Sequence, residues 1–159
     1  MTKYIDFYFD FISPYSYLAI HKLKTLKNYE EININYKPIL LGGLHNLGGI
    51  TAPAFNERKL KNMKFDCDLI AKKNNIPFIW NTKFPINSLY LMRGYLAINE
   101  ELKKKYFEKI QKVEIKDELK KLTNIAFEKN IFGAPTFVVN EKIFWGQDRL
   151  EYALDEYNS

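Results

Sequence analysis

Apolar and polar residues alternate in two short segments near the start of the chain, residues 4–9 and 32–39. This period of two predicts strands. Between them, apolar residues recur at helical spacing from Pro14 to Leu26. Proline suits a first helical turn, where its missing N–H is not needed. The segment therefore predicts strand, helix, strand, with a right-handed crossover that makes the two strands parallel.

The last third of the chain returns to a mixed α/β pattern. Residues 117–129 have helical spacing, and residues 136–139 and 142–145 read as two strands joined by a turn at 140–141. Asp148, with Glu151 three residues later, has the spacing of a capping box that opens a final helix. Strand, helix, strand followed by helix, hairpin, helix is the order of an α/β thioredoxin-like fold, which we take as a single domain spanning residues 1–159.

The middle of the chain looks helical from about residue 59 to 112, interrupted at Pro77 and Pro85, with Asn87 or Ser88 as a further N-cap. The glycine-rich stretch 41–49 lacks both GxGxxG and a P-loop lysine, so we interpret it as a flexible lip beside a cleft. Residues ~42–112 are therefore expected to form a helical insertion in the thioredoxin-like domain.

Composition excludes several classes of protein. With one cysteine, Cys67, and two histidines, the chain offers no internal disulfide and no metal-ligand set. The formal charge of +5 permits nucleic-acid binding, but the lysines are interleaved with glutamates, which favours a solvated helix surface and a small anionic ligand. No apolar run is long enough to cross a bilayer. The start of the chain does not resemble a signal peptide, because Asp6 and Asp10 interrupt what would be its apolar stretch. We expect a cytoplasmic protein with no nucleic-acid or membrane partner.

Ser13 lies where the first strand gives way to the first helix. A redox enzyme of this fold would carry Cys-x-x-Cys in this turn, which here is Ser13-Pro14-Tyr15-Ser16. Disulfide exchange is thereby excluded. Ser13 can simply cap the helix. Alternatively, the helix N-terminus favours a negative charge, such as the thiolate of an external thiol like glutathione.

Two further positions have both a structural and a functional interpretation. Ala134–Pro135 can be an ordinary trans step into a strand, or a cis bond that turns the Ala134 backbone toward an extended peptide ligand. Asp148 can cap the last helix, or it can bind a ligand ammonium group while the helix N-terminus holds a carboxylate.

Five segments in order resemble the 2-hydroxychromene-2-carboxylate isomerase family, which is grouped with kappa-class glutathione transferases in the DsbA-like branch of thioredoxin folds. Any one of these segments is weakly specific, but the five in family order are specific. They span both ends and the middle of the chain: residues 9–19, 38–43, 84–89, 132–137 and 144–150.

The resemblance implies an enzyme that uses glutathione as its cofactor. It implies that Ser13 is the catalytic serine, which hydrogen-bonds the sulfur and keeps it a thiolate. By the same resemblance, Ala134–Pro135 pairs with the cysteinyl part, Gln147 and Asp148 hold the γ-glutamyl end, and Lys61 contacts glutathione. The thiolate would add to an unsaturated carbonyl substrate, allow a bond to rotate, and then leave.

The chain also departs from the family pattern. Between Lys112 and Asp117 it passes almost directly into the closing helix, where the family has several more helices, and Ile50 replaces an expected asparagine. We therefore expect a shortened insertion, which would leave the cleft wider and wetter. The alternative to an isomerase acting on a small, anionic aromatic substrate is a non-catalytic thioredoxin-like protein that binds glutathione or another small molecule. A homodimer is compatible with the resemblance.

Overall fold

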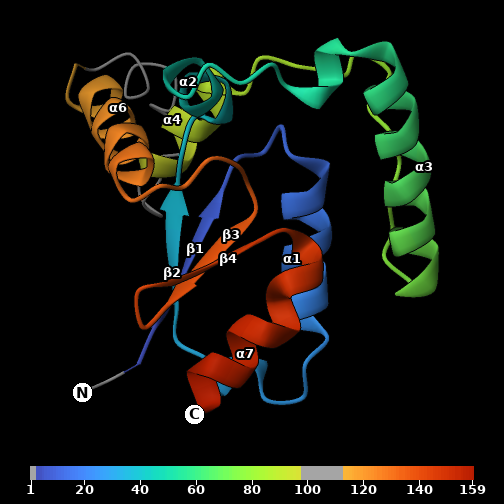
Figure 1. Ribbon diagram of the computed structural model, residues 1–159, viewed down its shortest axis with the longest axis vertical. Helices are drawn as coiled ribbons and strands as arrows, with labels where there is room; N and C mark the ends of the chain where they lie inside the picture. Colours follow the sequence, from blue (N-terminus) through green and yellow to red (C-terminus); the bar gives the residue numbers. More distant parts are fainter. Residues whose placement is uncertain (1–2, 98–112) are drawn as a thin grey trace.

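A four-stranded mixed sheet forms the centre of the computed structural model, which describes residues 3–97 and 113–159 (Figure 1). The strands are β1 (Ile5–Phe9), β2 (Ile34–Pro38), β3 (Thr136–Val139) and β4 (Lys142–Trp145), in the order β2-β1-β3-β4. β1 is parallel to β2 and antiparallel to β3, and β3 is antiparallel to β4. The four strands predicted from the sequence are confirmed.

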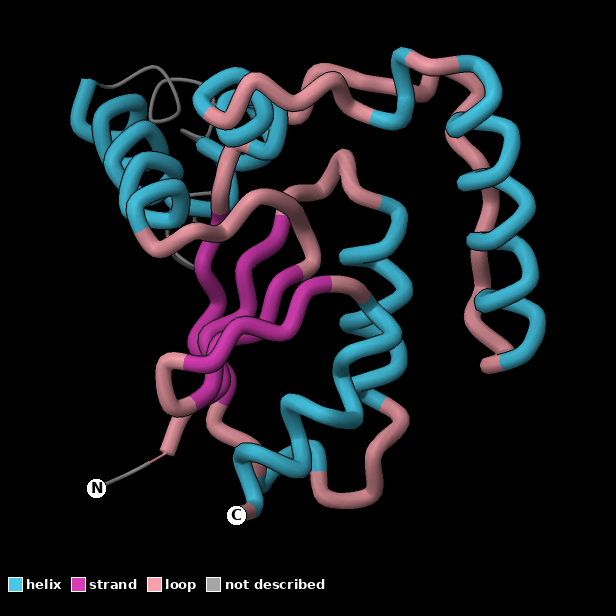
Figure 2. The backbone as a smooth tube through the Cα atoms, in the orientation of Figure 1, coloured by secondary structure: helices cyan, strands magenta, loops and turns pink. Residues whose placement is uncertain are grey.

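The helices fall into three groups around this sheet (Figures 1 and 2). α1 (Pro14–Lys24) and α7 (Leu150–Asn158) lie side by side, α2 (Leu41–Leu47), α4 (Leu89–Ala97) and α6 (Val113–Glu128) gather beyond the ends of β1 and β2, and α3 (Glu57–Lys73) stands apart beside α1. Short 3₁₀ turns are η1 (Tyr29–Glu31), η2 (Pro53–Phe55) and η4 (Gln147–Arg149). Among the described residues, no helix is long and apolar enough to cross a membrane.

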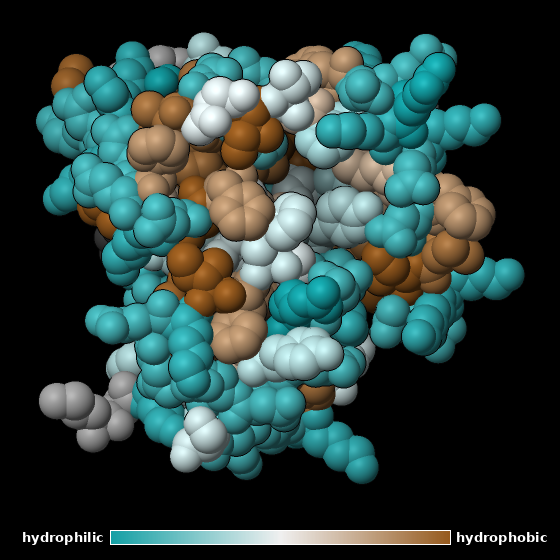
Figure 3. Space-filling view, viewed as in Figure 1, coloured by the Kyte–Doolittle hydropathy of each residue, from teal (hydrophilic) through white to brown (hydrophobic). Residues whose placement is uncertain are grey.

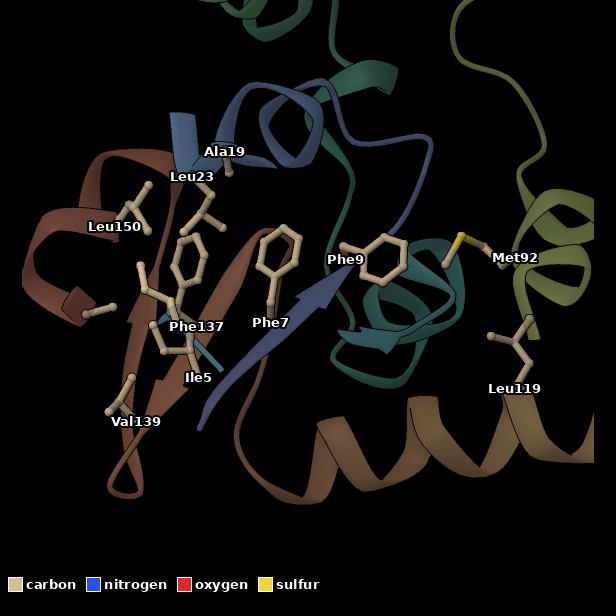
Figure 4. Packing of buried hydrophobic residues seen from close by; sticks show 12 residues of the cluster. Ile5, Phe7, Phe9, Ala19, Leu23, Met92, Leu119, Phe137, Val139 and Leu150 are labelled. Atoms are coloured by element: carbon tan, nitrogen blue, oxygen red, sulfur yellow. The ribbon is translucent and has the colours of Figure 1, made fainter. Parts of the chain in front are cut away.

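The two faces of the sheet carry two separate apolar clusters, as the alternation requires. Phe7 and Phe137 stack with ring centroids 5.0 Å apart and pack with Leu23 of α1 and Leu150 of α7 (Figure 4). Tyr8, one residue along, belongs to the second cluster, which is completed by Ile39, Leu44, Ala126 and Ile131. Fully burying one such side chain contributes about 1.5–3 kcal/mol, so both helix layers are held firmly on the sheet.

The glycine-rich stretch is not a flexible lip, and that prediction is wrong. Most of it is helix α2, which is anchored at its N-terminus and by a buried side chain. The Leu41 amide donates to the Asp10 carboxylate over 2.7 Å, and the side chain of Leu44 is fully buried. Only Gly49, after the helix, has a positive φ, of 63°. The tertiary anchors outweigh the low helix propensity of glycine.

The predicted N-cap at Asp148 is also wrong. α7 begins at Leu150, its cap residue is Arg149, and no side chain of the described residues caps it. Asp148 instead lies in the 3₁₀ turn η4, where its carboxylate accepts a hydrogen bond from Arg149 over 2.9 Å. The helix itself and Glu151 in its first turn are as predicted.

The helical middle of the chain is described in part. α3 and α4 fall within the predicted helical region, and Asn87 accepts a hydrogen bond from the first amide of α4, that of Leu89, over 3.0 Å. The closing helix is described from Val113, four residues before the predicted start. The rest of the predicted insertion, residues 98–112, lies outside the described residues.

Candidate functional site

A hydrogen bond between Ser13 and Ala134 joins the two segments that the sequence singled out, 121 positions apart. The Ser13 hydroxyl donates to the Ala134 carbonyl over 2.8 Å and accepts from the Ser16 amide over 3.2 Å. Ser13 is 4% exposed and has extended backbone angles, so it is the N-cap of α1. The structural interpretation of Ser13 is confirmed, and the same hydroxyl also bridges to the second segment of the site.

The Ala134–Pro135 peptide bond is cis, as predicted. Among the hydrogen bonds of the described residues, none is donated by the Ala134 amide, although Ala134 is only 8% exposed. The Pro135 carbonyl accepts from the Gly146 amide over 3.0 Å. This bond brings the turn that follows β4 against the Ala134–Pro135 step.

Gln147 and Asp148 follow directly in that turn, and η4 contacts α1. Gly146 has a φ of +104°, and a Cβ added there would lie 2.5 Å from a carboxylate oxygen of Asp148. Glycine is therefore required for the Asp148 carboxylate to fold back over the chain. The structure brings both predicted residues to the same side as Ser13, with the Asp148 carboxylate in an exposed ion pair with Arg149.

Lys61 is the predicted site residue that the structure does not join to the others. It is exposed on α3, and none of the hydrogen bonds or ion pairs given for the described residues joins it to the Ser13 turn. α3 is nevertheless attached close to that turn, because the Tyr15 hydroxyl donates to the Asp66 carboxylate over 2.7 Å. Burial, and then this hydrogen bond, raise the pKa of Tyr15, so its phenol stays neutral.

Asp10, which was not among the predicted site residues, stabilises the Ser13 turn by hydrogen bonds. It is fully buried; its carboxylate accepts hydrogen bonds from the amides of Ile12 and Leu41, and its carbonyl accepts from the Ser13 amide over 3.0 Å. Burial raises the pKa of Asp10, and these hydrogen bonds oppose the shift. An acidic residue at the end of an apolar strand, just before the turn, was the available sequence signal.

His45 and Ser88 complete this buried polar group. Ser88 and His45 both lie close to the Asp10 carboxyl group, and both lower its pKa, although less than burial raises it. Burial lowers the pKa of His45, although the Asp10 charge acts in the opposite direction. The neutral imidazole is therefore favoured, and the group serves as a support beneath the site.

An exposed aromatic pair flanks the cis proline. The ring centroids of Phe132 and Trp145 lie 4.9 Å apart, and the two residues are 46% and 52% exposed. A Cβ at Gly133 would lie 2.5 Å from the indole nitrogen, so the close approach of Trp145 requires glycine. Figure 3 shows apolar side chains gathered near the centre of the face seen in Figure 1, between hydrophilic margins. The exposed Phe132–Trp145 pair gives the site an apolar border.

Comparison with known proteins places this arrangement in a family. The DsbA-like thioredoxin domain matches residues 4–113 and 102–158. A 2-hydroxychromene-2-carboxylate isomerase of Sphingobium xenophagum is 30% identical over 193 aligned positions, covering 99% of this chain and 98% of that protein. This chain belongs to the 2-hydroxychromene-2-carboxylate isomerase family. The predicted resemblance is confirmed, and with it the prediction of an isomerase-type enzyme.

Two other similarities extend the comparison. Glutathione S-transferase kappa 1 of Caenorhabditis elegans is 38% identical over 74 residues, which cover 46% of this chain and 33% of that protein. A solved 2-hydroxychromene-2-carboxylate isomerase superposes with a TM-score of 0.82 at 23% identity, covering 96% of this chain and 93% of that one. The superposition confirms the predicted DsbA-like thioredoxin fold.

Proposed function

We propose that this protein is an isomerase that binds glutathione at the Ser13 turn and acts on a small unsaturated carbonyl compound. The observation that carries the proposal is the Ser13–Ala134 hydrogen bond of 2.8 Å beside a cis proline. Family membership supports the reaction class, and the similarity to kappa-class glutathione transferases supports the cofactor.

The groups at this site fit a peptide-like thiol. The Ala134 amide, which donates to no described residue, and the Ala134 carbonyl can pair with an extended peptide, as in addition of a short strand. The Gln147 side chain and the exposed Asp148 carboxylate would bind the γ-glutamyl end, and Asp148 suits its ammonium group. Lys61 would approach from α3. When bound, glutathione supplies the thiolate nucleophile of the reaction.

Ser13 would donate a hydrogen bond to the sulfur, and the positive end of α1 would favour the negative charge there. The hydroxyl has a single hydrogen, which in this structure goes to the Ala134 carbonyl. To serve the sulfur, the hydroxyl must turn away from that carbonyl, while its oxygen continues to accept from the Ser16 amide. Cap and thiolate donor are thus two uses of one side chain.

Calorimetric titration with reduced glutathione, combined with ultraviolet titration of the bound thiolate, tests this proposal. A charge-assisted hydrogen bond is worth about 1.5–3 kcal/mol, so Ser13→Ala should raise the pKa of the bound thiol by about one to two units. S-methylglutathione, which has no thiol, should bind the wild type and Ser13→Ala alike. Absence of glutathione binding, or an unchanged thiol pKa in Ser13→Ala, would overturn the proposal.

The second candidate is a non-catalytic protein of the same fold that binds glutathione or another small molecule. Its support is the length of the chain: 159 residues align over 193 positions with the Sphingobium protein, and the two segments matched by the domain family overlap at 102–113. Both features agree with a shortened insertion. A wider, wetter cleft weakens the electrostatics on which thiolate addition depends.

A spectrophotometric assay with 2-hydroxychromene-2-carboxylate and reduced glutathione separates the two candidates. We expect weak or absent activity on this aromatic compound, because the insertion is shorter than in the family pattern and would enclose the substrate less fully. Rapid glutathione-dependent isomerisation would assign the full family activity and remove the second candidate. A single domain with an insertion at ~42–112, a homodimer and a cytoplasmic location remain parts of the proposal.

A further inference from the structure

A cavity of about 340 Å³ lies between α2, α4 and α6, away from the residues of the Ser13 site. These three helices meet beyond the ends of β1 and β2 in Figure 1, and α6 contacts both α2 and α4. This volume is within the range of small-molecule sites. Much of the cavity wall is apolar and comes from four leucines: Leu40, Leu47, Leu89 and Leu119.

The polar part of the wall carries an excess of positive charge. Arg93 from α4 and Lys116 and Lys120 from α6 all line the cavity, and Asp117 is the only acidic residue that does so among those described. Within residues 3–97 and 113–159, none of these four side chains forms an ion pair. The cavity is therefore a site of positive potential next to an apolar surface.

Arg93 indicates most directly that a hydrogen-bond acceptor is missing from the cavity. Its Nε is buried and has no hydrogen-bond partner among the described residues, while its guanidinium carbon lies 6.0 Å from the centre of the Tyr90 ring. A buried donor without an acceptor is unfavourable, and a charged donor more so. A ligand anion beside Arg93 would supply the acceptor.

The floor of the cavity is fixed by hydrogen bonds internal to the protein. The Thr123 hydroxyl accepts from the Leu40 amide over 3.0 Å and donates to the Leu119 carbonyl over 2.8 Å. Thr123 thus ties α6 to the start of α2, and the polar lining that remains for a ligand consists of the three cations with Asp117 and Asn124. These hydrogen bonds hold the Thr123 part of the cavity wall in place before any ligand binds.

We infer that this cavity binds a small organic carboxylate with an apolar body, its head on Arg93 and its body against the leucines. The site is independent of the proposed glutathione site, because no lining residue is shared with Ser13, Ala134, Pro135, Gln147 or Asp148. Lys116 and Lys120 attract the anion from the open side, so binding weakens as salt rises.

Calorimetric titration with octanoate tests the inference, with octanol and acetate as probes that lack the charge or the apolar body. Octanoate should bind at least tenfold more tightly than either probe. Arg93→Met keeps an apolar stem and removes the charge, so it should weaken octanoate binding by about ten- to a hundredfold. Lys121→Met is the matched control, because Lys121 is an exposed lysine on α6 that does not line the cavity.

A second variant keeps the test decisive if Arg93→Met does not fold. Lys116→Met/Lys120→Met changes side chains at the open side of the cavity and should weaken octanoate binding more than Lys121→Met does. Ser13→Ala and added glutathione should leave octanoate binding unchanged, so failure here is distinct from failure at the thiol site. The inference is overturned if octanoate shows no saturable binding, if octanol binds equally well, or if the lysine variants do not differ.

Discussion

Replacing Ser13 by alanine should lower the free energy of unfolding, quite apart from any effect on a thiol. The hydroxyl caps α1 through the Ser16 amide, and losing such a cap costs about 0.5–2 kcal/mol. It is also the donor to the Ala134 carbonyl, and Ala134 is 8% exposed. Leaving that buried acceptor unpaired adds about 1–3 kcal/mol. Because the two contributions share one hydroxyl, we expect a total loss of about 2–4 kcal/mol.

Urea unfolding followed by circular dichroism measures this loss as a shift in midpoint at constant slope. Ser16→Ala is a stringent control, because the Ser16 hydroxyl in the first turn of α1 is about equally buried but has no hydrogen-bond partner among the described residues. We expect Ser16→Ala to change stability by less than about 1 kcal/mol, since an unpaired buried hydroxyl contributes nothing favourable. If Ser13→Ala loses no more than Ser16→Ala, the bridge to Ala134 does not stabilise the fold.

Three further predictions concern buried groups near the site. Asp10→Asn should cost about 1.5–3 kcal/mol in the same urea assay, because the Ile12 and Leu41 amides donate to different carboxylate oxygens and asparagine replaces one of these with an NH2 donor. Asp6→Asn in β1 should cost little. Burial lowers the pKa of His45, so the stability contributed by the neutral imidazole is present above about pH 6.5 and is lost as pH falls. As pH falls, the melting temperature should therefore decline more steeply in the wild type than in His45→Gln. Parallel curves of melting temperature against pH would contradict this. Burial raises the pKa of the Cys67 thiol to about 12, so the folded protein should react with a thiol reagent far more slowly than the urea-unfolded chain, and equal rates would contradict its burial.

The strands and most helices followed from the sequence because their periodicity reports which face is buried. Phe7 and Phe9 point to one side of β1 and Tyr8 to the other, so a period of two was visible directly. Helix α2 was not predicted, because it depends on a hydrogen bond between residues far apart in the sequence. The Leu41 amide donates to the Asp10 carboxylate, and no local sequence pattern reveals this contact. The cavity at Arg93 was missed for a similar reason: three helices from separate parts of the chain must meet before its lining residues share a wall.

The candidate site was predictable as a pair of segments but not as a hydrogen-bonding arrangement. Fold order placed Ser13 near Ala134–Pro135, and the structure adds that one hydrogen links them. That hydrogen cannot serve the Ala134 carbonyl and a sulfur at the same time. A thiol that brings its own N–H to the Ala134 carbonyl would free the Ser13 hydroxyl without leaving a buried acceptor unpaired, whereas a simple thiol would not. Selectivity for a peptide-like thiol can therefore arise within the Ser13–Ala134 bridge itself, because the ligand N–H that replaces the Ser13 hydroxyl at the Ala134 carbonyl also frees that hydroxyl for the sulfur.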